Sequence, residues 1–413
     1  MRLQPFFVVG LLALTCFTAA APAAEPFQVK AGDVWVMAGD SITAQRQHSN
    51  YIEAYYRTRY PNLKVQFRNS GVGGHTTGST LARFDYDLAA FKPTIISIEL
   101  GMNDVGAGDD PARYIAGMQK LLASIRAVKA TPVLISSSPV NDGSKMDDWK
   151  SDRCRRIHPY TDALAKLAAE EKVVMVDQYH PLIKLWHENR NEDNTQKLSL
   201  GGDPVHPGPV GQYTMAAAIL AGLGAEKEVS SATLDADGKV VDAKQCKISD
   251  VKAGAGSLSF TRLDERSPWP VPTACKTALQ VLPSIADQSR YLLQVNGLAA
   301  GDYSVSLNGK EVAKVTAEQL AAGWNIATAG EAATGERGQQ IVALIGKLQG
   351  PANNAFRTAS KANDVAVKAK DEAKIAETQK AIAEAQAAID ALETELAALC
   401  QPQPIAFEIK GVK

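Results

Sequence analysis

The stretch Val34–Gln45, VWVMAGDSITAQ, runs from apolar, β-branched residues directly into Gly39, Asp40 and Ser41. Gly, Asp and Ser are common in turns and at helix N-caps, so taken alone this stretch indicates only the end of a strand. The same stretch also leaves a serine hydroxyl at a strand end, where a nucleophile could stand. The choice between turn and nucleophile depends on whether the chain also supplies a base, an orienting carboxylate and oxyanion donors.

Residues 33–223 repeat the pattern of a short apolar strand followed by a helix. The further strand-like runs are VQFRN (65–69), TIISIEL (94–100), PVLISSS (132–138) and VVMVD (173–177). Helical periodicity fills the gaps, most clearly in residues 111–130 and 158–172. Strands that alternate with helices of this length are typical of βαβ units. We therefore expect an α/β domain over residues 24–225, with a parallel sheet covered on both faces and TIISIEL as a central strand.

The chain changes character after residue 225. Residues 226–334 contain short strands and turns, including Asn308-Gly309 as a hairpin signal, and predict a small β module. Residues 335–401 are rich in Ala, Lys and Glu, and residues 402–413 read as a strand that returns to the β module. The helical insertion carries an apolar residue every seven positions, at Ile375, Ile382, Ile389 and Leu396.

This seam indicates a coiled-coil-like helical hairpin with its turn at Gly350-Pro351. We expect the seam to pack within the chain, against the helix around residues 339–348. A coiled coil between two copies of the chain is the alternative. No residue outside the α/β domain completes a Ser, His and acid cluster, so we expect the C-terminal half to be an accessory module that supplies no catalytic group.

Four polar blocks follow strands of the α/β domain. They are residues 39–43 (GDSIT), 69–77 (NSGVGGHTT), 101–104 (GMND) and 203–206 (DPVH). The carboxyl ends of strands in an open α/β sheet are where ligands bind, so these blocks are expected to meet. Residues 73–80 also match the spacing of a phosphate-binding loop, but Ser79 stands where that loop needs lysine, which argues against nucleotide binding.

The residue types in these blocks fit nucleophilic acyl transfer. Ser41 needs a base to remove its proton, and His206 can act as that base. Asp203, three residues before the histidine, can hold the ring in the required tautomer. The backbone N–H groups of Ser41 and Gly74 and the side-chain amide of Asn103 can then bind the oxyanion.

These blocks resemble those of the SGNH (GDSL-type esterase/lipase) hydrolase superfamily. Ser41 matches its nucleophile, Gly74 and Asn103 match its oxyanion-hole residues, and Asp203 and His206 match its DxxH block. Asp40, Gly101 and Asp104 stand beside these positions as supporting residues. The resemblance implies a flavodoxin-like three-layer α/β/α fold and an esterase that needs neither a metal nor another cofactor.

We therefore predict a serine ester hydrolase that removes short acyl groups, above all acetyl, from a carbohydrate. The alternatives are a lipase or lysophospholipase and a non-catalytic carbohydrate-binding surface protein. The net charge is −1, with 44 basic and 45 acidic residues, which argues against a nucleic-acid partner.

Residues 1–23 read as a signal peptide, with Arg2, an apolar run and small residues. A transmembrane anchor and a lipoprotein signal at Cys16 are the alternatives. The protein is accordingly expected to be secreted or periplasmic, with no membrane span in the mature chain. Four cysteines remain after removal of the signal and suggest two disulfides of undetermined pairing: Cys154, Cys246, Cys275 and Cys400.

Overall fold

The N-terminal part of the chain is an α/β domain built on a five-stranded parallel sheet. The computed structural model describes residues 26–144, 148–188 and 203–412. The strand order is β2-β1-β3-β4-β5, and all neighbours are parallel. The strands are β1 (Val34–Gly39), β2 (Gln66–Gly71), β3 (Ile95–Glu99), β4 (Thr131–Ile135) and β5 (Val174–Val176). Every residue of β3 is buried, as expected for a central strand of a doubly covered sheet.

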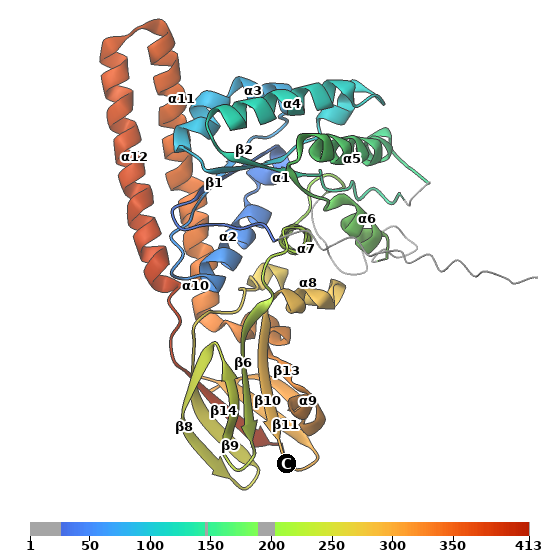
Figure 1. The fold of residues 1–413 in the computed structure, drawn as a ribbon, viewed down its shortest axis with the longest axis vertical. Helices are drawn as coiled ribbons and strands as arrows, with labels where there is room; N and C mark the ends of the chain where they lie inside the picture. Colours follow the sequence, from blue (N-terminus) through green and yellow to red (C-terminus); the bar gives the residue numbers. More distant parts are fainter. Residues whose placement is uncertain (1–25, 145–147, 189–202, 413) are drawn as a thin grey trace, which may run out of the picture.

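Helices cover both faces of this sheet, which gives the predicted three-layer α/β/α arrangement (Figure 1). The helices α2 and α7 pack together on one face, and α3, α4 and α5 lie on the other (Figure 1). The helix bounds are α1 (Ser41–Ala44), α2 (Gln47–Arg59), α3 (Thr77–Ala82), α4 (Ala112–Ala127), α5 (Asp152–Glu171), α6 (Tyr179–Glu188) and α7 (Pro209–Gly222). Short helical turns lie at η1 (Phe84–Leu88), η2 (Ala89–Phe91) and η3 (Asp104–Ala107).

The β module that follows consists of two sheets with a hydrophobic cluster of their own. One sheet has the order β13-β10-β6-β7 and the other β12-β11-β14-β9-β8. All pairs are antiparallel except β6 with β10. The last strand, β14, lies between β9 and β11, so the end of the chain is part of the module. Asn308 and Gly309 join β11 to β12 with φ values of 49° and 79°, as a type I′ hairpin turn requires.

The strands of this module are β6 (Glu228–Asp235), β7 (Val240–Lys244), β8 (Cys246–Gly254), β9 (Ser257–Asp264), β10 (Arg290–Asn296), β11 (Asp302–Leu307), β12 (Lys310–Thr316), β13 (Trp324–Asn325) and β14 (Ile405–Gly411). Its helices and helical turns are η4 (Thr273–Cys275), α8 (Ala278–Val281), η5 (Pro283–Gln288), α9 (Ala317–Ala322) and η6 (Ile326–Ala333).

A long helical hairpin precedes the last strand, but its turn is not where the sequence predicted it. The helix α10 (Gly335–Lys347) continues through a π-helical turn, η7 (Leu348–Ala352), into α11 (Asn353–Ala369). A π turn can accommodate the missing N–H of Pro351 without ending the helix. The chain reverses instead at Lys370, whose φ is 57°, and returns as α12 (Glu372–Leu399).

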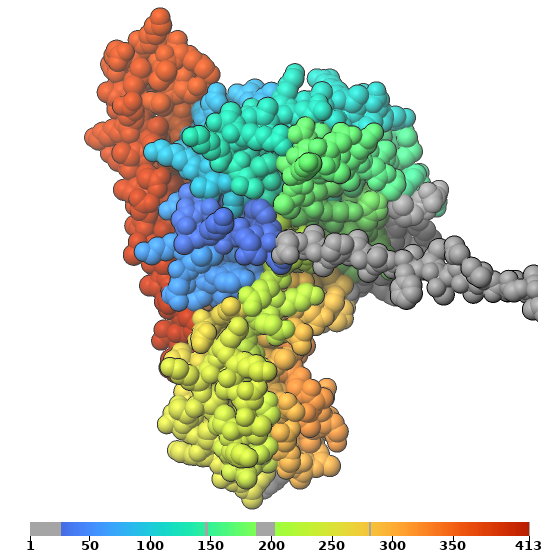
Figure 2. All heavy atoms as spheres, in the orientation of Figure 1, coloured from blue at the N-terminus to red at the C-terminus, as the bar shows by residue number. Residues whose placement is uncertain are grey.

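The apolar seam of α12 packs within the chain, chiefly against α11, and reaches α10 and η7 as well. Ile389 and Leu396 are fully buried, whereas Ile375 and Ile382 are half-buried. The expected partner, the helix around residues 339–348, is therefore only a minor neighbour. Beyond the α/β domain the hairpin projects on its own, while the β module forms a separate lobe (Figure 2).

The helical segment also completes the open edge of the parallel sheet. The edge strand is β2, and side-chain amides replace its missing neighbour. The Nε2 of Gln349 donates to the Phe67 carbonyl at 2.7 Å, and Asn69 N–H donates to the Gln349 Oε1 at 3.0 Å. Asn353 Nδ2 donates to the Asn69 carbonyl at 2.7 Å. The helices are thus built into the α/β domain and do not form a detached accessory unit.

The cysteines do not form the two disulfides that their number suggested. Cys246, Cys275 and Cys400 are free thiols within the described part of the chain. Their neighbours differ: the Cys275 thiol contacts the Tyr51 hydroxyl, whereas Cys400 is the C-cap residue of α12. The proposed signal peptide at residues 1–23 lies outside the described residues. Among the described helices, none is long and apolar enough to cross a membrane.

Candidate active site

Ser41 begins α1 directly beyond β1, and the glycine before the block is required by packing. A Cβ on Gly39 would lie 2.0 Å from the Thr43 Oγ1 and 2.9 Å from the Glu99 carbonyl oxygen. Asp40 is the N-cap of α1 and accepts a hydrogen bond from the Ile42 N–H at 3.0 Å. The Gly-Asp-Ser sequence is therefore a strand-to-helix junction that also places the serine at the sheet edge.

His206 connects Ser41 to Asp203 through a continuous chain of hydrogen bonds. The His206 Nε2 lies 2.8 Å from the Ser41 Oγ, and the Nδ1 lies 2.9 Å from the Asp203 Oδ2. Asp203 also accepts from the backbone N–H groups of His206 and Val205, which fixes the carboxylate on its own loop. With Nδ1 protonated, the ring donates to Asp203 and accepts from the serine hydroxyl. This is the arrangement that a general base for Ser41 needs.

Hydrogen bonding keeps the Asp203 carboxylate ionised. Burial acts to raise the pKa of Asp203, but the hydrogen bonds from the His206 ring and from the two backbone N–H groups outweigh it and lower that pKa. An ionised carboxylate is what stabilises the imidazolium formed when His206 takes the serine proton.

The second and third blocks meet beside Ser41. A Cβ on Gly73 would lie 3.9 Å from the Ser41 Cβ, so this loop passes directly over the serine. Gly74 has a φ of 74°, a left-handed conformation that favours glycine. Asn103 Nδ2 donates to the His75 carbonyl at 3.1 Å and to the Asp40 Oδ2 at 3.3 Å. The structure therefore brings together all five residues for which the sequence predicted a catalytic or oxyanion role.

Two of the predicted supporting residues fix these loops. Asp104 accepts from the Thr77 N–H at 3.1 Å and from the Thr77 hydroxyl at 2.8 Å, which ties the third block to the second. Gly101 has a φ of 131°, and its carbonyl accepts from the Val105 N–H. Both residues act on the position of Asn103 and of the loop that carries Gly74.

A buried polar network beneath Ser41 was not predicted from the sequence. Glu99, at the end of β3, accepts from the Thr43 hydroxyl at 2.9 Å and the Gln178 amide at 2.9 Å. Its Oε2 also lies 3.3 Å from the His48 Nε2. The His48 Nδ1 in turn lies 2.7 Å from the Gln212 Oε1. One signal was available, because Glu99 is the single charged residue in the apolar run TIISIEL.

Burial controls protonation in this network. Burial raises the pKa of Glu99 to about 7, and burial lowers the pKa of His48 to about 4. Burial, with help from the Glu99 charge, likewise raises the pKa of Asp40 to about 7. Glu99 and Asp40 therefore keep their protons to a higher pH than the exposed Asp203, and His48 loses its proton at a lower pH than an ordinary imidazole.

One cluster among the described residues has the side chains of a metal site. His158 and Asp162 lie one turn apart on α5, and His180 lies in the first turn of α6. Their ligand atoms lie within 4.8 Å of one another, and the His180 Nδ1 lies 2.6 Å from the Asp177 Oδ2. None of the five residues around Ser41 belongs to this cluster.

Comparisons with known proteins identify the family of the domain that carries these residues. Residues 37–213 match the GDSL-like Lipase/Acylhydrolase family, and this range contains all four polar blocks. An acetylxylan esterase of Geobacillus stearothermophilus is 24% identical over 189 residues, which cover 43% of this chain and 80% of that protein. Esterase TesA of Pseudomonas aeruginosa is 27% identical over 179 residues, which cover 42% of this chain and 80% of that protein.

The C-terminal half is also found in a solved structure. A gut microbial diltiazem-metabolizing enzyme superposes with a TM-score of 0.76 at 22% identity, over 93% of this chain and 99% of that one. This similarity covers the β module and the helical hairpin as well as the α/β domain, and it shows a shared fold. Residues 37–213 therefore form a domain of the GDSL-like (SGNH) lipase/acylhydrolase family, and the enzyme class of this domain is carboxylic ester hydrolase.

Proposed function

We propose that the protein removes short acyl groups, above all acetyl, from the hydroxyl groups of a carbohydrate, with Ser41 as nucleophile. The observation that carries this proposal is the hydrogen-bonded chain from the Ser41 Oγ through His206 to Asp203. Free serine is a weak nucleophile, and this chain supplies the base and the orienting carboxylate that activate it.

In the first half-reaction, the Ser41 Oγ attacks the acyl carbon and its proton passes to the His206 Nε2. The oxyanion that forms accepts hydrogen bonds from the Ser41 and Gly74 N–H groups and from the Asn103 amide. When the intermediate collapses, the bond to the sugar oxygen breaks and His206 returns the proton to that oxygen. Water then attacks the acyl-serine with His206 again as base, which releases the carboxylic acid and restores Ser41.

The surroundings of the site favour a hydrophilic substrate. A cavity of about 470 Å³ is lined by Asn103 and reaches Arg113 and Lys120. A second cavity, of about 350 Å³, lies on the His75 side of the same loop and contains four charged side chains. The charged and amide side chains in these linings can hydrogen-bond the hydroxyl groups of a sugar, which a long acyl chain does not offer. The relative named as an acetylxylan esterase supports the same choice.

We further propose that the protein acts outside the cytoplasm, as a secreted or periplasmic enzyme. Residues 1–23 carry the charge, apolar run and small residues of a signal peptide. Mass spectrometry of the protein exported by its host would test this, because the mature chain should begin near residue 24.

The test of the activity is hydrolysis of p-nitrophenyl acetate and p-nitrophenyl palmitate, together with acetate release from a panel of acetylated glycans. Acetate turnover with little palmitate turnover supports the proposal, whereas preference for palmitate indicates the lipase alternative. The Ser41→Ala variant should lose essentially all turnover, and Ser257→Ala, in the β module, should lose none. Turnover of neither ester by the wild type would favour the non-catalytic alternative.

A further inference from the structure

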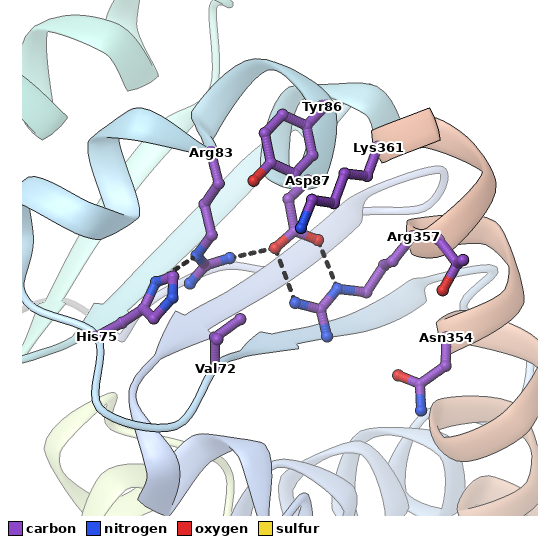
Figure 3. Close-up of a pocket in the computed structure, with 9 residues that line it drawn as sticks. Val72, His75, Arg83, Tyr86, Asp87, Asn354, Arg357 and Lys361 are labelled. Atoms are coloured by element: carbon purple, nitrogen blue, oxygen red, sulfur yellow. Dashed lines mark hydrogen bonds and ion pairs between the residues drawn. The ribbon is translucent and has the colours of Figure 1, made fainter. Parts of the chain in front are cut away.

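A charged cavity lies between the loop that passes Ser41 and the helix α11 (Figure 3). At this cavity the buried Asp87 carboxylate pairs with two guanidinium groups. Arg83 pairs with the Asp87 Oδ2, and Arg357 makes two hydrogen bonds to the same carboxylate, at 2.5 and 2.7 Å. Lys361 extends from α11 with its amine pointing into the space near Asp87, but no hydrogen bond joins it to another described residue (Figure 3).

This cavity and the serine share one wall. The loop residues Val72 and His75 line the cavity, while Gly73, between them, faces Ser41. The His75 carbonyl accepts from the Asn103 amide, and the His75 Nδ1 accepts from the Arg83 Nε at 3.1 Å. A molecule bound in the cavity would therefore lie against the same loop that carries the oxyanion glycine.

Positive charge in this region exceeds negative charge. Arg83, Arg357 and Lys361 line the cavity with Asp87 as the only carboxylate among its lining residues. A fourth cation, Arg46, lies alongside: its Nη2 donates to Asn354, another lining residue, at 3.1 Å. The buried Arg46 Nε has no hydrogen-bond acceptor among the described residues.

Such an excess is costly unless an anion accompanies it, because burial removes part of the hydration of Arg83, Arg357 and Arg46, whereas Lys361 is exposed. Burial first, and the nearby Arg357 charge second, lower the pKa of Arg46, which agrees with crowded positive charge. Burial together with the Arg83 charge also lowers the pKa of His75, so the imidazole beside the cavity is neutral at pH 7 and adds no further charge.

We propose that this cavity is an anion subsite, which binds a carboxylate or a sulfate on the carbohydrate part of the substrate while the ester lies at Ser41. The proposal rests on the proposed function and narrows its substrate class to acidic glycans. Lys361 is the residue expected to contact the anion first, because Asp87 already occupies Arg83 and Arg357. The C-terminal helices would then determine specificity for a reaction carried out by the N-terminal domain.

The test compares three acetylated oligosaccharides: one with uronate groups, its carboxyl-reduced neutral counterpart, and a sulfated one. We expect the wild type to prefer one or both acidic substrates. Lys361→Met should lower kcat/KM on the preferred substrate roughly tenfold, mainly through KM, since a charge-assisted hydrogen bond is lost. The neutral oligosaccharide and p-nitrophenyl acetate should be unaffected. Lys380→Met, which removes an exposed lysine from α12, is the matched control.

Binding of the deacetylated uronate and sulfated oligosaccharides to Ser41→Ala, measured by calorimetry at low salt, separates this proposal from the proposed function. Binding that Lys361→Met weakens, but Lys380→Met does not, supports the subsite even if no ester is hydrolysed. The subsite proposal would be overturned if an active wild type had the same kcat/KM on all three substrates. It would also be overturned if neither acidic oligosaccharide bound to Ser41→Ala, or if Lys361→Met and Lys380→Met had equal effects. The charges would then serve only to hold α11 on the α/β domain.

Discussion

Replacing Gln349 with leucine should destabilise the α/β domain although the residue lies 280 positions from its sheet. The Gln349 side chain is buried and joins three groups. Its Nε2 donates to the Phe67 carbonyl and to the Glu53 carboxylate, each at 2.7 Å, and its Oε1 accepts from the Asn69 N–H at 3.0 Å. Leucine has a similar volume, so the substitution removes these bonds without opening a large cavity.

The size of the loss follows from the groups left behind. The buried Asn69 N–H and the buried Glu53 Oε2 would lose the Gln349 side chain and be left without another hydrogen-bond partner, whereas the Phe67 carbonyl keeps its bond from the Arg68 Nη1 at 2.6 Å. An orphaned buried polar group costs about 1–3 kcal/mol, so two of them predict a loss of roughly 2–6 kcal/mol in the free energy of unfolding. At about 2–4 °C per kcal/mol for a domain of this size, the melting temperature should fall by about 10 °C.

Urea unfolding followed by far-UV circular dichroism measures this loss, and p-nitrophenyl acetate turnover reports separately on the site. The control is Gln386→Leu on α12, where one hydrogen bond to Asp390, a turn away, is removed. That bond is worth less than about 0.5 kcal/mol. A loss below 1 kcal/mol for Gln349→Leu, or the same loss in both variants, would refute the view that side-chain amides complete the sheet edge.

Further predictions concern the site and the network behind it. Asp203→Asn should lower kcat on p-nitrophenyl acetate by on the order of 10⁴ with little change in KM, because an asparagine can hold His206 in the wrong tautomer; a change confined to KM would contradict this role. Asn103→Ala should lower kcat by roughly 10²–10³-fold through loss of one oxyanion donor, and unchanged kcat would exclude the donor. Activity should survive EDTA, since the proposed residues need no metal, and loss restored by a divalent ion would overturn that. In the wild type, the raised pKa of Glu99 and the lowered pKa of His48 make opposite contributions to the pH dependence of stability between pH 4.5 and 6.5. The substitution His48→Gln removes the His48 contribution, which in the wild type raises the free energy of unfolding as pH rises from 4.5 to 6.5. Relative to wild type, the free energy of unfolding of the variant should therefore fall as pH rises over this range, by at most about 1.4 kcal/mol per pH unit. Urea midpoints at pH 5 and pH 7 check this, and parallel pH profiles of the two proteins would refute it.

The α/β fold and the arrangement of the site could be predicted from the sequence because the decisive signals are local. The first three polar blocks lie at the ends of β1, β2 and β3, and parallel strands bring their carboxyl ends to one edge. The fourth block was expected at a strand end too, but among the described elements it comes after α6 and directly before α7, and it still brings His206 to Ser41 across 165 residues. The oxyanion roles of Gly74 and Asn103 followed from the chemistry of acyl transfer and match the family resemblance; in the structure, the loop that carries Gly74 passes Ser41, and Asn103 bonds to Asp40, the residue before the serine.

The features that could not be predicted depend on contacts between distant segments. Nothing near Gln349 or Arg357 indicates that these side chains face β2 and Asp87, since amides and guanidinium groups are common on any helix surface. The prediction of a turn at Gly350-Pro351 was wrong because a π turn can carry proline inside a continuous helix. The reversal at Lys370 uses a left-handed lysine, which no local sequence preference favours.

The covered edge of β2 also bears on how the chain is made. The segment that covers this strand is synthesised about 280 residues after it, and all strands of the β module except β14 are translated in between. At about 5–20 residues per second, the ribosome needs roughly 14–56 s to cover that distance. Throughout that interval the outer edge of β2 in the nascent α/β domain has no hydrogen-bond partners, and such an edge is the kind of surface on which chains associate. A chaperone that holds the emerging domain until α10 and α11 arrive would therefore raise the yield of folded protein, and fragments ending before residue 335 should aggregate.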